Sequence, residues 1–197
     1  MMPLRALLLA CLAGWALAAQ AGASTVVCFN YGCARQTEVS FDDAQLESVR
    51  AGLAVAGDAA AEREALARAI GTLLAHAGAQ APIAADRAGN LLDDGVEGRM
   101  DCIDHATTTT RLLILLEERG WLRFHRMLPP ERRSFLILQH FSAVIEEIGP
   151  APSTAEAQPA VNLGARFALD SWFVDHGEPA VVLPLEEWMM GEGPNVQ

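Results

Sequence analysis

The chain has 197 residues, of which 51% are hydrophobic and 20% charged, and its net charge at pH 7 is −11. This apolar content is enough for the core of one domain and argues against a disordered chain. All 14 basic residues are Arg, so the absence of Lys excludes a P-loop lysine and lysine Schiff-base or general-base chemistry. The acidic balance, with no basic run, argues against nucleic acid or an anionic membrane as a partner.

Residues 1–23 have the pattern of a secretory signal peptide. Arg5 precedes an apolar run over residues 6–19, and residues 19–21 and 21–23 both match the small-x-small cleavage pattern. The run is short for a membrane-spanning helix, and no second span follows. We therefore expect a bacterial periplasmic or secreted protein with no stable membrane span after cleavage.

The predicted mature part, residues 24–197, reads as a single domain with 13 Arg against 25 acidic residues, a net charge of −12. An alternative is a lipoprotein that is modified at Cys11 in the sequence Leu-Leu-Ala-Cys. The apolar run before Cys11 is very short, which favours the cleaved signal peptide.

The four cysteines have different expected roles. Cys11 leaves with the signal peptide. Cys28 and Cys33 are separated by four residues, including Asn30 and Gly32, which can turn the chain. Disulfides persist outside the cytoplasm, so we predict a Cys28–Cys33 bridge, with two reduced structural thiols as the alternative. Cys102 is then the unpaired thiol.

The first half of the domain combines strand-like stretches with helices. Strand character occurs within residues 26–41, and capping residues together with helical spacing of apolar residues predict the helices that follow. Asp101 is a plausible N-cap for the third helix, and Asp104 can complete a capping box. Thr residues 107–110 are poor helix formers, so tertiary contacts must support them. The predicted helices cover residues 42–55, with Ser40 as N-cap, 59–77, with Asp58 as N-cap, and 101–119, and residues 79–99 are expected to be a loop.

The second half has strand patterns. We predict a strand over residues 121–127 that ends before Pro129-Pro130, and one long or two short strands over residues 134–148. A loop over residues 149–162, strands over 166–174 and 180–183, and a short helix over 185–190 complete the chain. Helices followed by an antiparallel sheet indicate the α+β class.

Cys102 lies at a predicted helix start, a position that favours a reactive thiol. In the first turn of a helix, backbone N–H groups and the helix dipole stabilise a thiolate, which would lower the thiol pKa, and the same N–H groups lie near a developing oxyanion. Asp101 and Asp104 act in the opposite direction through their charge. The alternative is a small buried Cys that packs a helix start.

His140 and Asp170 each sit inside an apolar strand pattern, where each needs a partner. If these strands form a hairpin, the two side chains become cross-strand neighbours. Asp170 would then orient the His140 ring, whose other nitrogen would face Cys102. A core His bonded to backbone is the alternative interpretation.

Residues 101–104, Asp-Cys-Ile-Asp at a helix start, followed by His140 and Asp170 on successive strands, resemble the transglutaminase-like superfamily. The resemblance is closest to the bacterial transglutaminase-like cysteine proteinases, covers about residues 95–190 and implies a papain-like α+β fold. It implies that Cys102 is the nucleophile, His140 the base and Asp170 the orienting residue. Ile103 stands where true transglutaminases usually have Trp, which favours a hydrolase over cross-linking.

We therefore expect an exported thiol hydrolase or acyltransferase that acts on an amide, peptide or ester bond of a peptide, a protein or a cell-wall peptide. No cofactor and no metal are expected. One alternative is a non-catalytic binding module on the same fold. Another is a metal site formed by Asp101, Cys102 and His105.

Several further residues are candidates by residue type. Gln139 and Asn30 are possible oxyanion donors. Ser171 lacks the G-x-S-x-G setting of a serine nucleophile. The expected structural residues are Trp172 and Trp188 in the core or a cleft wall, His125 in the core or at the surface, and His176 in a turn.

Overall fold

A computed structural model describes residues 22–89, 92–136, 138–148 and 164–194. The predicted loop 149–162 and almost all of the predicted signal peptide lie outside these residues. The elements in chain order are β1 (Ala23–Phe29), β2 (Arg35–Phe41), α1 (Asp43–Ala54), α2 (Ala59–Gly78), the short 3-10 helix η1 (Pro82–Ala85), α3 (Cys102–Glu118), β3 (His125–Phe135), β4 (Leu138–Glu147), β5 (Arg166–Asp170), β6 (Val181–Pro184) and α4 (Leu185–Met189).

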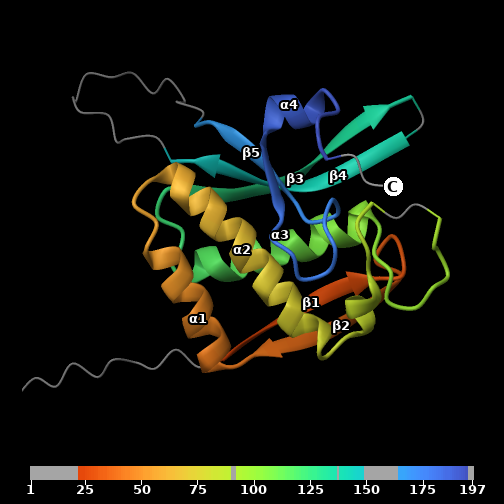
Figure 1. Ribbon diagram of the computed structural model, residues 1–197, viewed down its shortest axis with the longest axis horizontal. Coiled ribbons are helices and arrows are strands. Elements are labelled where there is room, and N and C mark those ends of the chain that lie inside the picture. Colours follow the sequence, from red (N-terminus) through yellow and green to blue (C-terminus); the bar gives the residue numbers. More distant parts are fainter. Residues whose placement is uncertain (1–21, 90–91, 137, 149–163, 195–197) are drawn as a thin grey trace, which may run out of the picture.

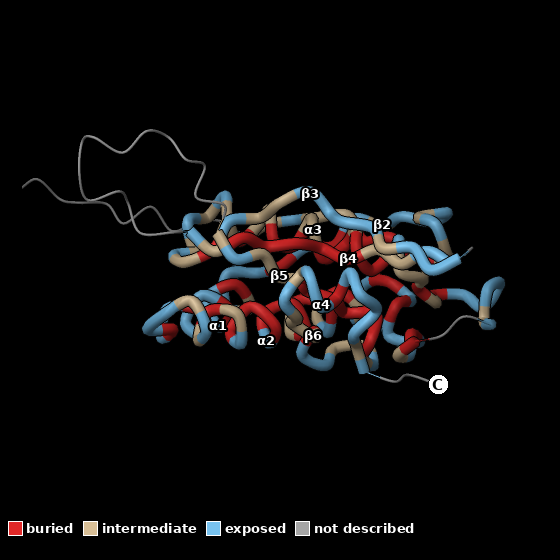
Figure 2. The backbone as a smooth tube through the Cα atoms, turned by 90° about the horizontal axis from the view of Figure 1, so that it is seen from above, coloured by how far each residue is buried: buried red, intermediate tan, exposed pale blue. Residues whose placement is uncertain are grey.

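The strands form two antiparallel sheets. Strands β1 and β2 form a hairpin, and the other four form a sheet in the order β3-β4-β5-β6. Helix α3 packs against β1 on one side and β4 on the other, while α2 crosses in front of it and α1 packs beside α2 (Figure 1). Seen from above, the buried parts of α2, α3 and β4 lie in the interior and the exposed segments lie outside (Figure 2). The protein is therefore α+β, as the sequence predicts.

Two groups of buried apolar residues hold these layers together. The larger joins the β1–β2 hairpin, the three long helices and the middle of the four-stranded sheet. The smaller consists of Ala168, Trp172, Phe173 and Trp188, and Cys102 packs against it. This second cluster connects the start of α3 with the end of β5 and with α4.

The helix starts follow local capping chemistry. The Asp58 side chain accepts from Ala61 N, as the sequence predicts for α2. The N-cap of α1 is Asp42 and not Ser40, because Asp42 forms a capping box with Gln45. Among the described residues, no helix is long and apolar enough to cross a membrane.

The predicted end of a strand before Pro129 is wrong. Strand β3 begins at His125 and runs through both prolines, with its register against β4 shifting between Leu128 and Glu131. Proline fits here because β3 is at the edge of the sheet and the shift leaves the ladder irregular at that point. The apolar residues 134–148, predicted as one long or two short strands, are divided between the end of β3 at Phe135 and β4, which starts at Leu138.

Tertiary contacts support the threonines of α3. Thr108 Oγ1 accepts the backbone N–H of Cys28 at 3.0 Å, and the Thr109 hydroxyl lies 3.0 Å from that of Ser171. Both threonines are buried. The weak helix propensity of this stretch is thus offset by bonds to β1 and to the segment after β5.

Candidate functional site

Cys102 is the first residue of α3. The Asp101 carboxylate caps the helix by accepting the N–H groups of Ile103 at 3.1 Å and Asp104 at 2.9 Å, and Asp104 accepts the N–H of Asp101 in return at 3.2 Å. The capping box is the predicted one. It does not use the N–H of Cys102, which instead interacts with the sulfur of the same residue.

A disulfide closes the loop that covers this helix start. Cys28 and Cys33 are bonded, as predicted, with their Cα atoms 4.7 Å apart. Asn30, Tyr31, Gly32 and Cys33 all have positive φ, at 64°, 63°, 62° and 57°. Such left-handed backbone is costly for residues other than Gly, so it persists only where the surroundings hold it in place.

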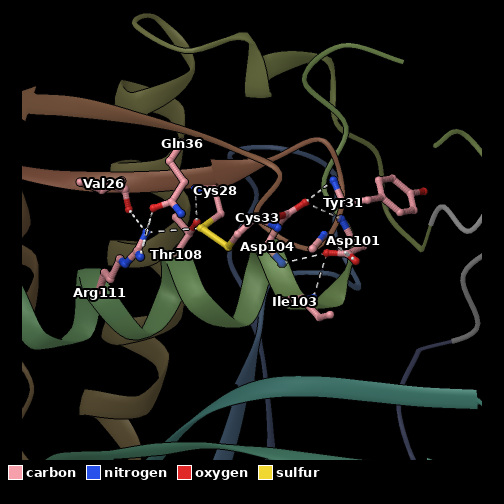
Figure 3. Close-up of a disulfide and its surroundings, with 11 residues drawn as sticks. Val26, Cys28, Tyr31, Cys33, Gln36, Asp101, Ile103, Asp104, Thr108 and Arg111 are labelled. Atoms are coloured by element: carbon pink, nitrogen blue, oxygen red, sulfur yellow. Dashed lines mark hydrogen bonds between the residues drawn. A yellow bond between two sulfur atoms is a disulfide. The ribbon is translucent and has the colours of Figure 1, made fainter. Parts of the chain in front are cut away.

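Two carboxylates hold this left-handed loop (Figure 3). Asp104 accepts the backbone N–H groups of Tyr31 at 2.8 Å and Cys33 at 2.6 Å. Asp101 accepts the N–H of Gly32 at 3.0 Å. The acidic residues on both sides of Cys102 therefore serve as acceptors for the disulfide loop as well as for the helix cap.

His140 and Asp170 are in direct contact. Ala143 pairs with Leu169 between β4 and β5, so continuing this register places Asp170 diagonally across from His140 on the same face. The two side chains meet at 2.6 Å between Nε2 and Oδ2. Because a carboxylate only accepts, the Nε2 atom carries the proton, and this leaves Nδ1 as the basic nitrogen of neutral His140.

The Asp170 carboxylate is held at both oxygens. Oδ1 accepts the backbone N–H of Trp172 at 3.1 Å, and Oδ2 accepts the indole N–H of Trp188 at 3.0 Å in addition to His140. Asp170 is 2% exposed. These bonds offset the cost of burying a charge and fix the direction of the carboxylate.

Aromatic rings surround His140. The centroid of its ring lies 4.8 Å from that of Trp172, 5.4 Å from that of Phe173 and 5.6 Å from that of Trp188. The side chain is still 12% exposed, so its edge reaches the surface. Trp172 and Trp188 are thus buried neighbours of His140, as their predicted placement in the core requires.

Cys102 lies against the backbone on both sides of His140. Its thiol donates to the carbonyl oxygen of Gln139, with 3.8 Å between the heavy atoms. The backbone N–H of Phe141 stabilises the sulfur as a thiolate. Because Cys102 also packs on the cluster that contains Trp172 and Trp188, the three residues predicted from the sequence share one neighbourhood.

The expected lowering of the Cys102 pKa is wrong. Burial raises the pKa of this thiol to about 11, and the charges of Asp101 and Asp170 add to the effect, while the N–H of Phe141 opposes it. Desolvation outweighs the helix start because the free energy that the dipole supplies to a thiolate is small compared with the cost of removing its hydration. Cys102 is therefore a neutral thiol at pH 7 and needs a base in order to react.

The two amides considered as oxyanion donors have other contacts. Asn30 donates to Glu97 at 2.8 Å and accepts the N–H of Gly98 at 2.8 Å. The Gln139 side chain is exposed and accepts from Arg132 at 3.5 Å. Its backbone carbonyl, and not its amide, is what meets Cys102.

A second, fully buried polar network lies behind the site. His105 bonds to Asp86 through Nε2 at 2.8 Å and to the Ser171 hydroxyl through Nδ1 at 2.9 Å. Asp86 also accepts the N–H of Met100 at 2.9 Å. The network ties the segment before Cys102, the α3 helix and the residue after Asp170 together. No sequence motif marks Asp86, which follows the short helix η1.

This network is inconsistent with the alternative metal site formed by Asp101, Cys102 and His105. Both ring nitrogens of His105 are engaged, so neither is directed to Cys102 or Asp101. Cys28, Cys33 and Asp104 also lie within metal-binding distance of one another, but the two sulfurs are joined in the disulfide. Ser171 is 2% exposed, and His125 is buried against Glu62 at 2.8 Å.

The chain matches no family model, no curated protein and no solved structure. The functional argument therefore rests on the fold class and on the chemistry of the grouped Cys102, His140 and Asp170. These define an α+β protein with a hydrogen-bonded His–Asp pair, its Asp buried and its His partly exposed, beside the only unpaired cysteine among the described residues.

Proposed function

We propose that this protein is an exported cysteine-dependent hydrolase or acyltransferase that acts on an amide, peptide or ester bond. The observation that carries the proposal is the 2.6 Å contact between His140 and Asp170, with Cys102 bonded to the backbone carbonyl of the residue before His140. A structural core would have little need for a thiol, an imidazole and a carboxylate in one place.

The chemistry follows from which nitrogen is free. Asp170 holds Nε2 of His140, so Nδ1 accepts the Cys102 proton as the sulfur attacks the carbonyl carbon. The resulting imidazolium, stabilised by Asp170, returns the proton to the leaving amine or alcohol. An acyl-thioenzyme remains, and attack by water or an amine on its carbonyl releases the acyl group and regenerates the thiol.

The first turn of α3 supplies a donor for the oxyanion. The N–H of Cys102 is outside the Asp101 cap and lies beside the sulfur. A backbone N–H at a helix start is a favourable place for developing negative charge. The neutral resting thiol fits this route, in which His140 removes the proton during attack.

The fold assignment that accompanies this proposal is a papain-like member of the transglutaminase-like superfamily. Its support is the order of the elements, with Cys102 at a helix start and His140 and Asp170 on neighbouring antiparallel strands. The disulfide and the signal-like residues 1–23 support a periplasmic or secreted location. The substrate class is a peptide, a protein or a cell-wall peptide, and the acidic chain favours a neutral or basic one.

The test is the rate at which iodoacetamide alkylates Cys102 in the folded, non-reduced protein, followed by mass spectrometry of the peptide that contains it. We expect the rate to fall on acidification, because only neutral His140 accepts the thiol proton. His140→Ala should remove this step and lower the rate at pH 7 about tenfold or more.

His76→Gln is the matched control, because His76 lies on α2 and contacts Gln45. It should leave the rate and its pH profile unchanged. If Cys102 reacts at the same rate in the wild-type protein and in His140→Ala, the proposal fails. The non-catalytic binding module is then the better description of the protein.

A further inference from the structure

The short helix α4 brings a buried donor to the His–Asp pair. Trp188 is fully buried, and its indole N–H donates to Oδ2 of Asp170 at 3.0 Å. This is the same oxygen that accepts Nε2–H of His140 at 2.6 Å. Two donors therefore share one carboxylate oxygen.

Arg133 fixes Trp188 in this place. Arg133 pairs with His140 across β3 and β4, and its guanidinium lies 4.8 Å from the centroid of the Trp188 ring. The same group donates to the carbonyl of Trp188 and, at 2.9 Å, to that of Glu192. The strand opposite His140 thus holds the C-terminal segment over the pair.

We propose that Trp188 is a positioning residue that sets the basicity of His140 through their shared Asp170 oxygen. The inference rests on the proposed function. A donor to a carboxylate stabilises its charge, so less of that charge remains to stabilise the imidazolium. The indole thereby keeps His140 a weaker base than Asp170 alone would make it, and it holds Oδ2 toward the ring.

Trp172 provides a matched control. Its ring also contacts His140, and it is buried to a similar extent. Its indole N–H, however, is buried without a hydrogen-bond partner in the described part of the chain. Replacing each Trp by Phe therefore removes an N–H while keeping an aromatic ring, and only one of the two N–H groups touches Asp170.

The experiment measures the titration of the His140 ring by NMR in the folded full-length chain, in both the wild-type and the Cys102→Ser background. We expect Trp188→Phe to raise the pKa of His140 by about half to one unit, the size expected from part of one charge-assisted hydrogen bond. The step in the Cys102 alkylation profile should move by the same amount. Trp172→Phe should change neither.

A His140 pKa that is unchanged or lower in Trp188→Phe overturns the proposal. If this variant does not fold, the test uses the wild-type protein. The chemical shift of the Trp188 indole proton should change with pH as His140 titrates, and this change should be absent in His140→Ala. An indole resonance of Trp188 that does not shift as His140 titrates also overturns the proposal. The His140 pKa can be measured in the Cys102→Ser background, where no thiol is present at this position. An unreactive Cys102 would therefore refute the proposed function and leave the role of Trp188 standing.

Discussion

Cys33 donates its backbone N–H to the carboxylate of Asp104 at 2.6 Å, which fastens the disulfide loop to the helix turn that contains Cys102. Asp104 is fully buried and accepts from Tyr31 as well. The disulfide and the helix start therefore form one structural unit, and disturbing either part affects the other.

Removal of the disulfide should destabilise the protein. Cys28 and Cys33 are only five positions apart, so the chain-entropy contribution of the bridge is about 2 kcal/mol. We expect the double variant Cys28→Ser/Cys33→Ser to lose at least this much free energy of unfolding in a denaturant titration, because the left-handed loop is released as well. Cys102→Ser is the control and should change stability less. Equal stability of the double variant and the wild type would contradict the prediction.

Asp104 should make stability depend on pH in an unusual direction. Burial, and then the charge of Asp101, raise the pKa of this carboxyl from 3.8 to about 6. The folded state thus binds the proton more tightly, and the stabilisation is full below pH 3.8 and lost as the pH rises through 6.

The variant Asp104→Asn removes this titration. The free energy of unfolding of the wild type minus that of the variant should fall between pH 4 and pH 7, by at most about 3 kcal/mol. Asp43→Asn, at an exposed position in the first turn of α1, is the control. A difference that stays constant or grows with pH would show that Asp104 does not titrate in this way.

Glu62 should make the free energy of unfolding depend on pH in the direction opposite to that of Asp104. Burial by itself would raise the pKa of Glu62, but the bonds from His125 and from the backbone N–H groups of Arg123 and Phe124 outweigh it and lower the pKa. A lowered pKa stabilises the fold above the ordinary value of 4.5, and this contribution is lost as the pH falls.

Unfolding measurements on Glu62→Ala test this pair. The variant leaves the buried His125 and the partly buried N–H groups of Arg123 and Phe124 without their acceptor, so it should lose about 3 kcal/mol or more at pH 7. The loss should shrink on acidification to pH 3. Glu64→Ala, on the exposed face of the same helix, should be nearly neutral. A loss for Glu62→Ala that does not vary with pH would contradict the assigned charge.

Ser171 should prove structural although it forms a Ser–His–Asp array with His105 and Asp86. We expect Ser171→Ala to cost about 1 to 2 kcal/mol of stability, because His105 and Thr109 lose their contact to the hydroxyl. Its Cys102 alkylation rate should stay within about twofold of the wild type, since the bonds of Asp170 are intact.

A fluorophosphonate reagent should not label Ser171, because the residue is 2% exposed. Ser142→Ala serves as the stability control, since within the described part of the chain the Ser142 hydroxyl bonds only to the neighbouring carbonyl of Ala143 at 3.0 Å. Labelling of Ser171 would show that the buried array opens and would assign a nucleophile other than Cys102.

Local chemistry explains what could be predicted along the chain. The capping box of Asp101 and Asp104, the cap at Asp58 and the Cys28–Cys33 bridge depend on residues a few positions apart, so the sequence contains them completely. The continuation of β3 through Pro129 depends instead on its place at a sheet edge. No local pattern records which strand is outermost.

The sequence by itself determined the residue types and the local setting of the candidate site, with Cys102 at a helix start and His140 and Asp170 each in need of a partner. Only the tertiary structure decided that His140 and Asp170 meet, that Trp188 and Arg133 reach this pair from α4 and β3, and that burial raises the pKa of Cys102. The physical reason is distance along the chain. Caps and short disulfides form between neighbours, whereas desolvation and shared hydrogen bonds depend on segments that only folding brings together.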